Sequence, residues 1–234
     1  MLAAAIALAG CGGTADQSGS DVNLALTRPG AVHAGIYLAV QRGFDGAEGT
    51  TIHMTPSADP VRALDKAQAG LAVLDIHDLA IARARGDDIV AVMAIVERPE
   101  PALRPRRLRR ATQRAPGAPV YPELVLATLR STLTDDPGTV RGAVAALQRG
   151  YREAYIDPES AVQALTTAVP SLKAPKAAAD LDRLGPDFQA SSQTFGELNP
   201  ARLRAWAAWE PRTGLVKRPP DVARAFEGRF VKPG

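Results

Sequence analysis

Residues 21–44, DVNLALTRPGAVHAGIYLAVQRGF, contain the pattern that decides the fold. The apolar run VNLAL at 22–26 predicts a strand. Arg28, Pro29 and Gly30 then predict a loop, and residues 32–41 have the apolar spacing of a helix that ends at Gly43. The stretch is therefore one strand-loop-helix unit.

The same unit repeats in the residues that follow. Asp59 with Pro60 predicts the start of a second helix that ends near Gly70, and Asp75 begins a third that Gly86 closes. The expected strands are 51–55, 71–74 and 89–96, and the third helix is expected at 77–85. Short strands that alternate with helices of about ten residues favour a mostly parallel α/β sheet with right-handed connections.

The pattern changes after Glu97. Residues 98–122 are rich in proline and arginine and have no periodic apolar face, which predicts a linker or an extended surface chain. The arginines of this run are Arg104, Arg106, Arg107, Arg109, Arg110 and Arg114. A solvated loop is the simplest interpretation. Contact with anionic lipid is the functional alternative, and nucleic acid is not expected for an exported protein.

The rest of the chain predicts an extended stretch at 123–128 followed by helices. A proline beside an acidic or amide residue marks each expected helix start. The first helix begins at Asp135 or Asp136 and runs to about Tyr155, and the others cover 158–168, 199–209 and the residues after Pro220. Trp206 and Trp209 lie three positions apart, on one helical face, where we expect core packing.

Composition excludes several classes of protein. Of the 234 residues, 46% are apolar and 23% are charged, which argues against disordered, collagen-like and multi-span membrane proteins. The single cysteine excludes an internal disulfide framework and a cysteine-based zinc site. The net charge of +3, from 28 basic and 25 acidic residues, gives no reason to expect nucleic-acid binding by the whole chain.

The first twenty residues predict an export signal and a tether. Residues 2–10, LAAAIALAG, are apolar or small, and they are too few to cross a bilayer as a helix, which takes about 20 residues. The stretch LAGC at 8–11 resembles a bacterial lipobox, which implies cleavage before Cys11, acylation of its thiol and a flexible tether at 14–20. The alternative is a buried N-terminal helix with a core cysteine, which the neighbouring glycines disfavour.

Four further segments carry a family resemblance together with the lipobox. They are PGAVHAGIYLAVQRGF at 29–44, AGLAVLDIHDLAIARARG at 69–86, YPELVLATLRSTLTDDPGTVRGAVAALQRGY at 121–151 and PARLRAWAAWEPRTGL at 200–215. In this order they make the chain similar to the solute-binding lipoproteins of bacterial ABC importers in the SsuA/THI5-like (NMT1/THI5-like) family, which includes aliphatic-sulfonate and thiamine-pyrimidine receptors. The resemblance implies two α/β lobes joined by hinge strands, a small molecule in the cleft between them, and lobe closure that the permease reads.

The sequence departs from this family in two places. In thiamine-pyrimidine-like members the loop after the first strand reads acid-aromatic-x-Pro-Asn, whereas residues 26–30 are LTRPG, so the aromatic that would stack on a flat heterocycle is missing. Residues 98–122 stand where the family places most of its second lobe, a small domain on the order of 50 to 100 residues. We expect an α/β, periplasmic-binding-protein-like (type II) fold with one α/β lobe, a strongly shortened second lobe and a helical C-terminal half. The expected divisions are a lipoprotein signal and tether at 1–20, a first lobe at 21–97, a second-lobe remnant at 98–122, and a hinge return with C-terminal helices at 123–234.

The candidate ligand-binding residues follow the first and third expected strands. Ligands of open α/β sheets bind at the carboxyl ends of the strands, where helix N-termini present free N–H groups. The candidates are Pro29, Gly30, His33, Tyr37, Asp75, His77 and Asp78, with Tyr37 as a stacking surface. Helix capping by the two aspartates and internally satisfied histidines are the structural alternatives. A metal site is not expected, because adjacent residues of one loop rarely supply a complete set of ligands.

These residues and the resemblance predict a solute-binding protein of an ABC importer, lipid-anchored at Cys11 on the extracytoplasmic face of the cell membrane. Its partners would be permease subunits and a small nitrogenous solute such as a thiamine pyrimidine precursor. No cofactor, metal, nucleic acid or catalysis is expected. The alternative is an internally deleted, degenerate or repurposed relative that acts as an interaction protein without a transport role, which the short 98–122 segment favours.

Overall fold

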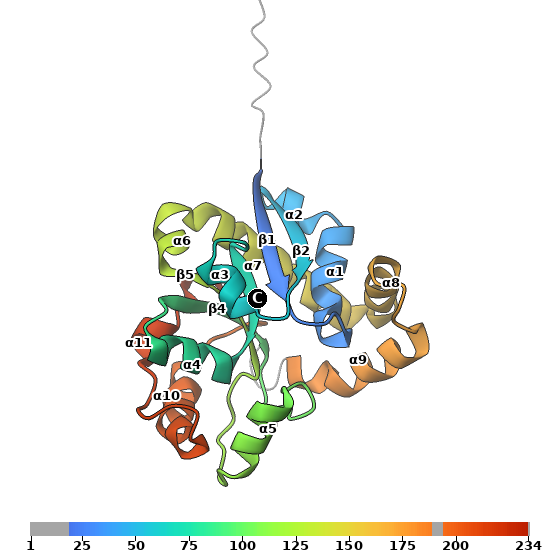
Figure 1. Ribbon diagram of the computed structural model, residues 1–234. Coiled ribbons are helices and arrows are strands. Elements are labelled where there is room, and N and C mark those ends of the chain that lie inside the picture. Colours follow the sequence, from blue (N-terminus) through green and yellow to red (C-terminus); the bar gives the residue numbers. More distant parts are fainter. Residues whose placement is uncertain (1–18, 189–193, 234) are drawn as a thin grey trace, which may run out of the picture.

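The computed structural model describes residues 19–188 and 194–233, which form one five-stranded sheet with helices on both faces (Figure 1). The predicted signal segment and Cys11 lie outside the described residues. The strands, in the spatial order β2-β1-β3-β5-β4, are β1 (Ser20–Leu26), β2 (Thr50–Pro56), β3 (Leu71–Asp75), β4 (Ile89–Val96) and β5 (Leu124–Leu129). β1 pairs in parallel with β2 and β3, whereas β5 pairs antiparallel with β3 and β4. The predicted α/β architecture is therefore confirmed, but the prediction of a mostly parallel sheet is wrong, because β5 returns antiparallel between β3 and β4.

The first half of the chain contains the predicted helices and one short helix that was not predicted, α2 (Phe44–Ala47). The predicted ones are the 3-10 turn η1 (Ala31–His33) with α1 (Ala34–Gln41), α3 (Pro60–Asp65) and α4 (Ile76–Arg85). The Asp59 side chain accepts a hydrogen bond from the Arg62 N–H, and Asp75 accepts one from the His77 N–H. Both predicted N-caps are confirmed. α3 ends well before Gly70, because Ala67 turns into the left-handed region at φ 52°.

The C-terminal half is helical, as predicted. Its elements are α6 (Arg130–Asp135), α7 (Pro137–Ile156), α8 (Pro158–Ala168), α9 (Ala174–Phe188), α10 (Pro200–Trp209), η2 (Glu210–Thr213), α11 (Val222–Ala225) and η3 (Gly228–Phe230). Asp136 caps α7, which settles the choice left open between Asp135 and Asp136. α9 was not predicted, although its buried residues at 177, 181, 184 and 188 have helical spacing.

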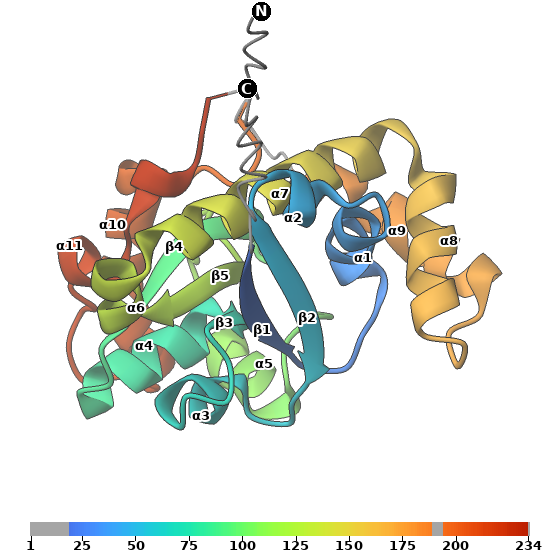
Figure 2. The same ribbon diagram turned by 90° about the horizontal axis from the view of Figure 1, so that it is seen from above.

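The sheet separates two hydrophobic cores (Figure 2). On one face Leu24 and Val73 pack with α1, α7, α8 and α9, and on the other Ala25 and Leu74 pack with α3, α4 and α10. The period-two alternation of strand side chains produces this division. Trp206 and Trp209 are buried in the second core, which confirms their predicted packing. Within the described ranges, no helix combines the length and apolarity needed to cross a membrane.

The segment between β4 and β5 is compact and contains the helix α5 (Arg106–Gln113). The described residues form no second sheet, so the strongly shortened second lobe is confirmed. The expected extended linker is wrong for residues 106–113. Leu108 and Thr112 are buried against the body, and the arginines between them are exposed. With so narrow a buried stripe, the sequence of this helix has no periodic apolar face.

Candidate functional site

A cavity of about 1040 Å³ lies at the carboxyl ends of β1, β2 and β3. One side of it consists of residues 27–33 and 56–61, and of Val73, Leu74, Asp75 and Asp78 at the end of β3 and the start of α4. The other side consists of residues 102–105 with Arg107, ahead of and within α5, and of Asp180, Arg183 and Leu184 on α9. Open α/β sheets bind ligands at this edge.

Five of the predicted ligand-binding residues line this cavity. They are Pro29, Gly30, His33, Asp75 and Asp78. The structure therefore brings together the two loops that the sequence singled out, and the ligand roles of these residues remain predictions.

Tyr37 and His77 do not line the cavity. Tyr37 packs in the core beside α7, and it offers no stacking surface there because only 5% of it is exposed. His77 is fully buried, and its ring nitrogens lie 2.7 Å from Glu210 Oε2 and 3.1 Å from the Tyr121 hydroxyl. His77 thus has no ring nitrogen free for a solute, and the alternative of an internally satisfied histidine describes it.

His33 and Asp75 line the cavity and have buried polar atoms that are not fully used in hydrogen bonds. His33 is buried, and the nearby Gly30 backbone raises the pKa of its ring, but neither ring nitrogen reaches hydrogen-bond geometry with a partner among the described residues. Asp75 uses Oδ1 to cap α4 at 2.8 Å from the His77 nitrogen, whereas Oδ2 has no partner in the same set. Buried polar groups are nearly always paired, so two incompletely paired groups at one cavity are candidates for hydrogen bonds with a bound molecule.

Burial makes both side chains neutral at pH 7. It lowers the pKa of His33 to about 4, so the imidazole is uncharged. Burial, and then repulsion by Glu123, raises the pKa of Asp75 to about 8, so the carboxyl group keeps its proton and can donate it in a hydrogen bond. The cavity therefore offers neutral donors and acceptors at the strand ends.

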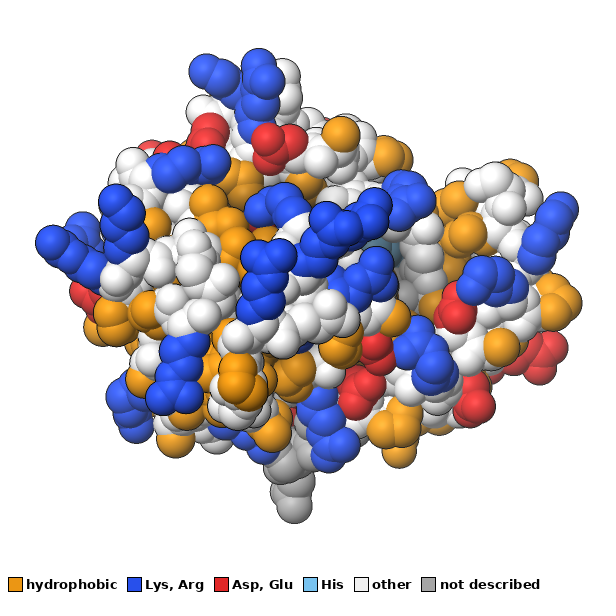
Figure 3. Space-filling view, turned by 60° about the horizontal axis from the view of Figure 1, so that its bottom comes forward, with side chains coloured by type: hydrophobic (Ala, Val, Ile, Leu, Met, Phe, Trp, Pro, Cys, Tyr) orange, Lys and Arg blue, Asp and Glu red, His pale blue; other side chains and the backbone are white. Residues whose placement is uncertain are grey.

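Five arginines also line the cavity. Four of the five that line the cavity have carboxylate partners: Arg85 with Asp87, Arg104 with Glu123, Arg107 with Asp78 and Arg183 with Glu100. Arg28 is exposed at the lining and has no ion-pair partner among the described residues. Lys and Arg side chains cluster on the face shown in Figure 3. An anionic group of a solute would meet Arg28 first.

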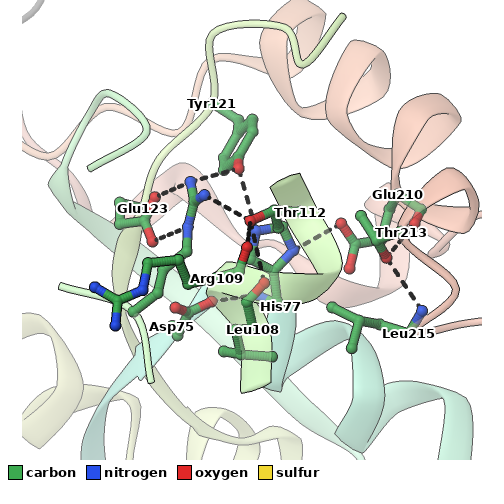
Figure 4. A network of polar contacts seen from close by, with 11 residues as sticks. Asp75, His77, Leu108, Arg109, Thr112, Tyr121, Glu123, Glu210, Thr213 and Leu215 are labelled. Atoms are coloured by element: carbon green, nitrogen blue, oxygen red, sulfur yellow. Dashed lines mark hydrogen bonds and ion pairs between the residues drawn. The ribbon is translucent and has the colours of Figure 1, made fainter. Parts of the chain in front are cut away.

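A buried polar network stands behind the cavity wall (Figure 4). Arg104 donates to both carboxylate oxygens of Glu123, at 2.7 and 2.6 Å, to the Tyr121 hydroxyl at 2.8 Å and to Thr112 Oγ1 at 2.9 Å. The Tyr121 hydroxyl also contacts the His77 ring, whose other nitrogen contacts Glu210, so the network extends from Arg104 to Glu210. Burial alone would lower the pKa of His77, but the hydrogen bond and charge of Glu210, with the nearby acids, raise it.

Sequence reasoning did not find this network. It grouped Arg104 with the solvated arginines around it, and it did not single out Tyr121, Glu123 or Glu210. Their partners are separated by 17 to 133 residues along the chain, so no local spacing could reveal them. No group of three or more histidine, cysteine or acidic side chains placed to hold a metal occurs within residues 19–188 and 194–233.

Comparisons with known proteins agree with the fold. Residues 30–106 match the family model described as NMT1/THI5 like. No curated protein sequence matches the chain significantly. Among solved structures, the alkanesulfonate-binding protein SsuA of Xanthomonas axonopodis pv. citri, bound to MOPS, is similar with a TM-score of 0.67 at 12% identity, over 89% of this chain and 98% of that one.

Two further structures give the same result. SsuA of Escherichia coli, a periplasmic aliphatic sulphonate binding protein, is similar with a TM-score of 0.63 at 13% identity, over 93% of this chain and 94% of that one. A Candida albicans protein with the generic periplasmic binding protein fold is similar with a TM-score of 0.66 at 10% identity, over 91% of this chain and 97% of that one. Residues 30–106 are thus NMT1/THI5-like in sequence, and the chain has the fold of the periplasmic binding proteins.

Proposed function

We propose that this protein is the solute-binding component of an ABC importer, and that its solute occupies the cavity at the carboxyl ends of β1 and β3. The observation that carries the proposal is that His33 and Asp75, which line one cavity beyond the adjacent strands β1 and β3, both have buried polar atoms without a hydrogen-bond partner among the described residues. A solute that pairs with them relieves the cost of leaving them unsatisfied. The solved structures with the same fold include receptors for sulfonates and nitrate, which is consistent with a transport role.

The chemistry of the cavity suggests what the solute offers. A protonated Asp75 donates a hydrogen bond, and a neutral His33 donates from one nitrogen and accepts at the other. A small nitrogenous solute with ring or amino nitrogens, such as a thiamine pyrimidine precursor, can pair with both groups. An anionic substituent, as in the sulfonates of the SsuA proteins, would lie near Arg28.

The proposal includes attachment to the membrane. The lipobox-like sequence at 8–11 supports acylation of Cys11 and a location on the extracytoplasmic side, where permease subunits would meet the protein. Labelling with a palmitate analogue tests this, because Cys11→Ala abolishes labelling if Cys11 carries the lipid. Equal labelling of both forms would reject the anchor.

Solute binding is tested by a thermal-shift screen with pyrimidines, thiamine, sulfonates and small amides. A compound at 100 times its dissociation constant adds about 2.7 kcal/mol to the free energy of unfolding. For a compound that binds, His33→Phe should weaken affinity at least about tenfold, because both ring nitrogens are lost. The matched control is Tyr37→Phe, a buried residue of the same segment that is outside the cavity lining, and it should change affinity less than about twofold. Equal effects of the two substitutions would place the solute elsewhere.

The second candidate is a repurposed relative without a transport role. The single sheet of the described residues favours it, because a lost lobe removes part of the surface that would bury a solute. If the folded protein gives no thermal shift with any compound of the screen, this candidate replaces the first.

A further inference from the structure

The segment that stands in place of a second lobe is fixed to the body of the protein by buried charge. We infer that Arg104 is a positioning residue that locks residues 98–122 to the sheet, so that the cavity is a fixed site and takes up its solute without closure of a hinge. This inference rests on the proposed solute-binding function and concerns how that site works.

The Arg104 side chain ties two parts of the segment to the residue that follows it. Its guanidinium fork donates to Tyr121 in the loop before β5 and to Thr112 in the last turn of α5, both within the segment, and to Glu123, which directly precedes β5. Arg104 is 7% exposed, and Glu123 and Tyr121 are 0% exposed. Glu123 also accepts a hydrogen bond from the Glu100 N–H at 2.9 Å. The wall of the cavity is therefore held from within by one bidentate ion pair.

Movement of this wall would break the ion pair. Glu123 would then stay buried at the end of β5 without a counter-charge, because its place in the sheet does not depend on α5. Loss of one partner from a buried pair is costly enough that such an open state should hold less than about 1% of the molecules.

Main-chain hydrogen bonds hold both ends of the segment. Val96 and Leu124 are partners in the antiparallel β4–β5 pairing, and the Glu123 N–H donates to the Val96 carbonyl at 2.7 Å. At the other end, the Glu97 N–H donates to the Asp187 carbonyl of α9 at 2.7 Å. A hinge would have to turn at these element-terminal residues, and at both points main-chain hydrogen bonds hold the segment to the sheet and to α9.

Ion pairs fix the outer part of the segment as well. Arg183 of α9 lies 2.7 Å from Glu100, and Arg107 of α5 pairs with Asp78 of α4. The cavity wall is thus connected by ion pairs to α9 and to α4.

Amide hydrogen exchange on the full chain, with and without the sulfonate MOPS as the probe, tests the inference. We expect the amides of α5 to exchange slowly without MOPS and at an unchanged rate with it. We also expect an unchanged radius of gyration in X-ray scattering, about 17 Å for a chain of this length. Exchange in α5 that slows only on adding MOPS, or a contraction of the molecule on binding, would overturn the fixed wall.

Substitutions separate the role of Arg104 from general stability. Arg104→Met should speed exchange of the α5 amides more than tenfold and weaken MOPS binding more than tenfold, whereas Arg109→Met, the same change at an exposed arginine within α5, should alter neither. If Arg104→Met does not fold, Arg104→Lys keeps a charge beside Glu123 without the fork, and it should still speed α5 exchange at least fivefold. Wild-type α5 exchange with the lysine would overturn the inference. Failure of wild type to bind MOPS or any compound of the screen counts against the proposed function, while the exchange rates without solute still decide whether the wall is fixed.

Discussion

Two regions border the cavity, and they are built by different physical means. Residues 20–85 repeat a strand, a loop and a helix, and helix starts there are set by side chains within three residues, such as Asp59 and Asp75. Residues 97–123 have one short helix and depend on buried contacts with distant parts of the chain. The first region therefore lines one side of the cavity, and the second provides the wall opposite it.

The difference lies in where the free energy resides. In the first region, each helix cap and each apolar side chain contributes a small part of the free energy of unfolding, so the loss of one such contribution should leave the region folded. The second region concentrates its stability in a few buried charges, which are costly to unpair. Substitutions in the two regions should consequently differ in how much they lower the free energy of unfolding.

The largest effect is expected for Glu123→Ala. It leaves Arg104, which is 7% exposed, without its carboxylate partner, and breaking a buried pair costs about 3–5 kcal/mol. Urea unfolding measures the loss. The matched control is Asp78→Ala, which breaks the pair with the 60% exposed side chain of Arg107 and should cost about 1 kcal/mol or less. Equal losses would show that the wall does not depend on its buried pair.

A smaller effect, on pH dependence, is expected at Asp75. Its pKa is about 8 in the folded protein, against 3.8 for an unperturbed aspartate, so between these values the folded state holds a proton that the unfolded state has released. The free energy of unfolding should therefore fall as pH rises toward 8. The lowered pKa of His33 acts in the opposite direction, but only between about 4 and 6.5.

Asp75→Asn isolates this contribution, because an amide can cap α4 and does not titrate. Between pH 6.5 and 8 the wild type should lose up to about 2 kcal/mol more stability than the variant. Asp75 is one of the acids that raise the pKa of His77, so the variant also loses part of that shift, which acts in the same direction. Parallel pH profiles of the two proteins in urea unfolding would mean that Asp75 ionises normally and is not a neutral donor at the cavity.

The same contrast explains what the sequence could predict. The strands of the first region, its caps and the edge that lines the cavity follow from spacing rules that act over a few residues, and the same rules predicted that His33 and Asp75 lie at that edge. Arg104 was not separated from its exposed neighbours, because burial depends on Glu123 and Tyr121, whose positions are set only by the folded sheet. His77 was misplaced for the same reason: its partner Glu210 is 133 residues away.

The smallest effect is expected at a local signal, the N-cap of α7. Asp136 Oδ1 accepts a hydrogen bond from the Thr139 N–H at 3.2 Å, and removing such a cap costs about 1 kcal/mol. Asp136→Ala should lower the free energy of unfolding by this amount in urea denaturation. Asp135→Ala is the matched control, because Asp135 is an equally exposed neighbour that does not cap the helix, and it should change stability by less than about 0.5 kcal/mol. If Asp136→Ala costs as much as Glu123→Ala, local and buried interactions do not divide the two regions, because a single cap would then weigh as much as the ion pair behind the cavity wall.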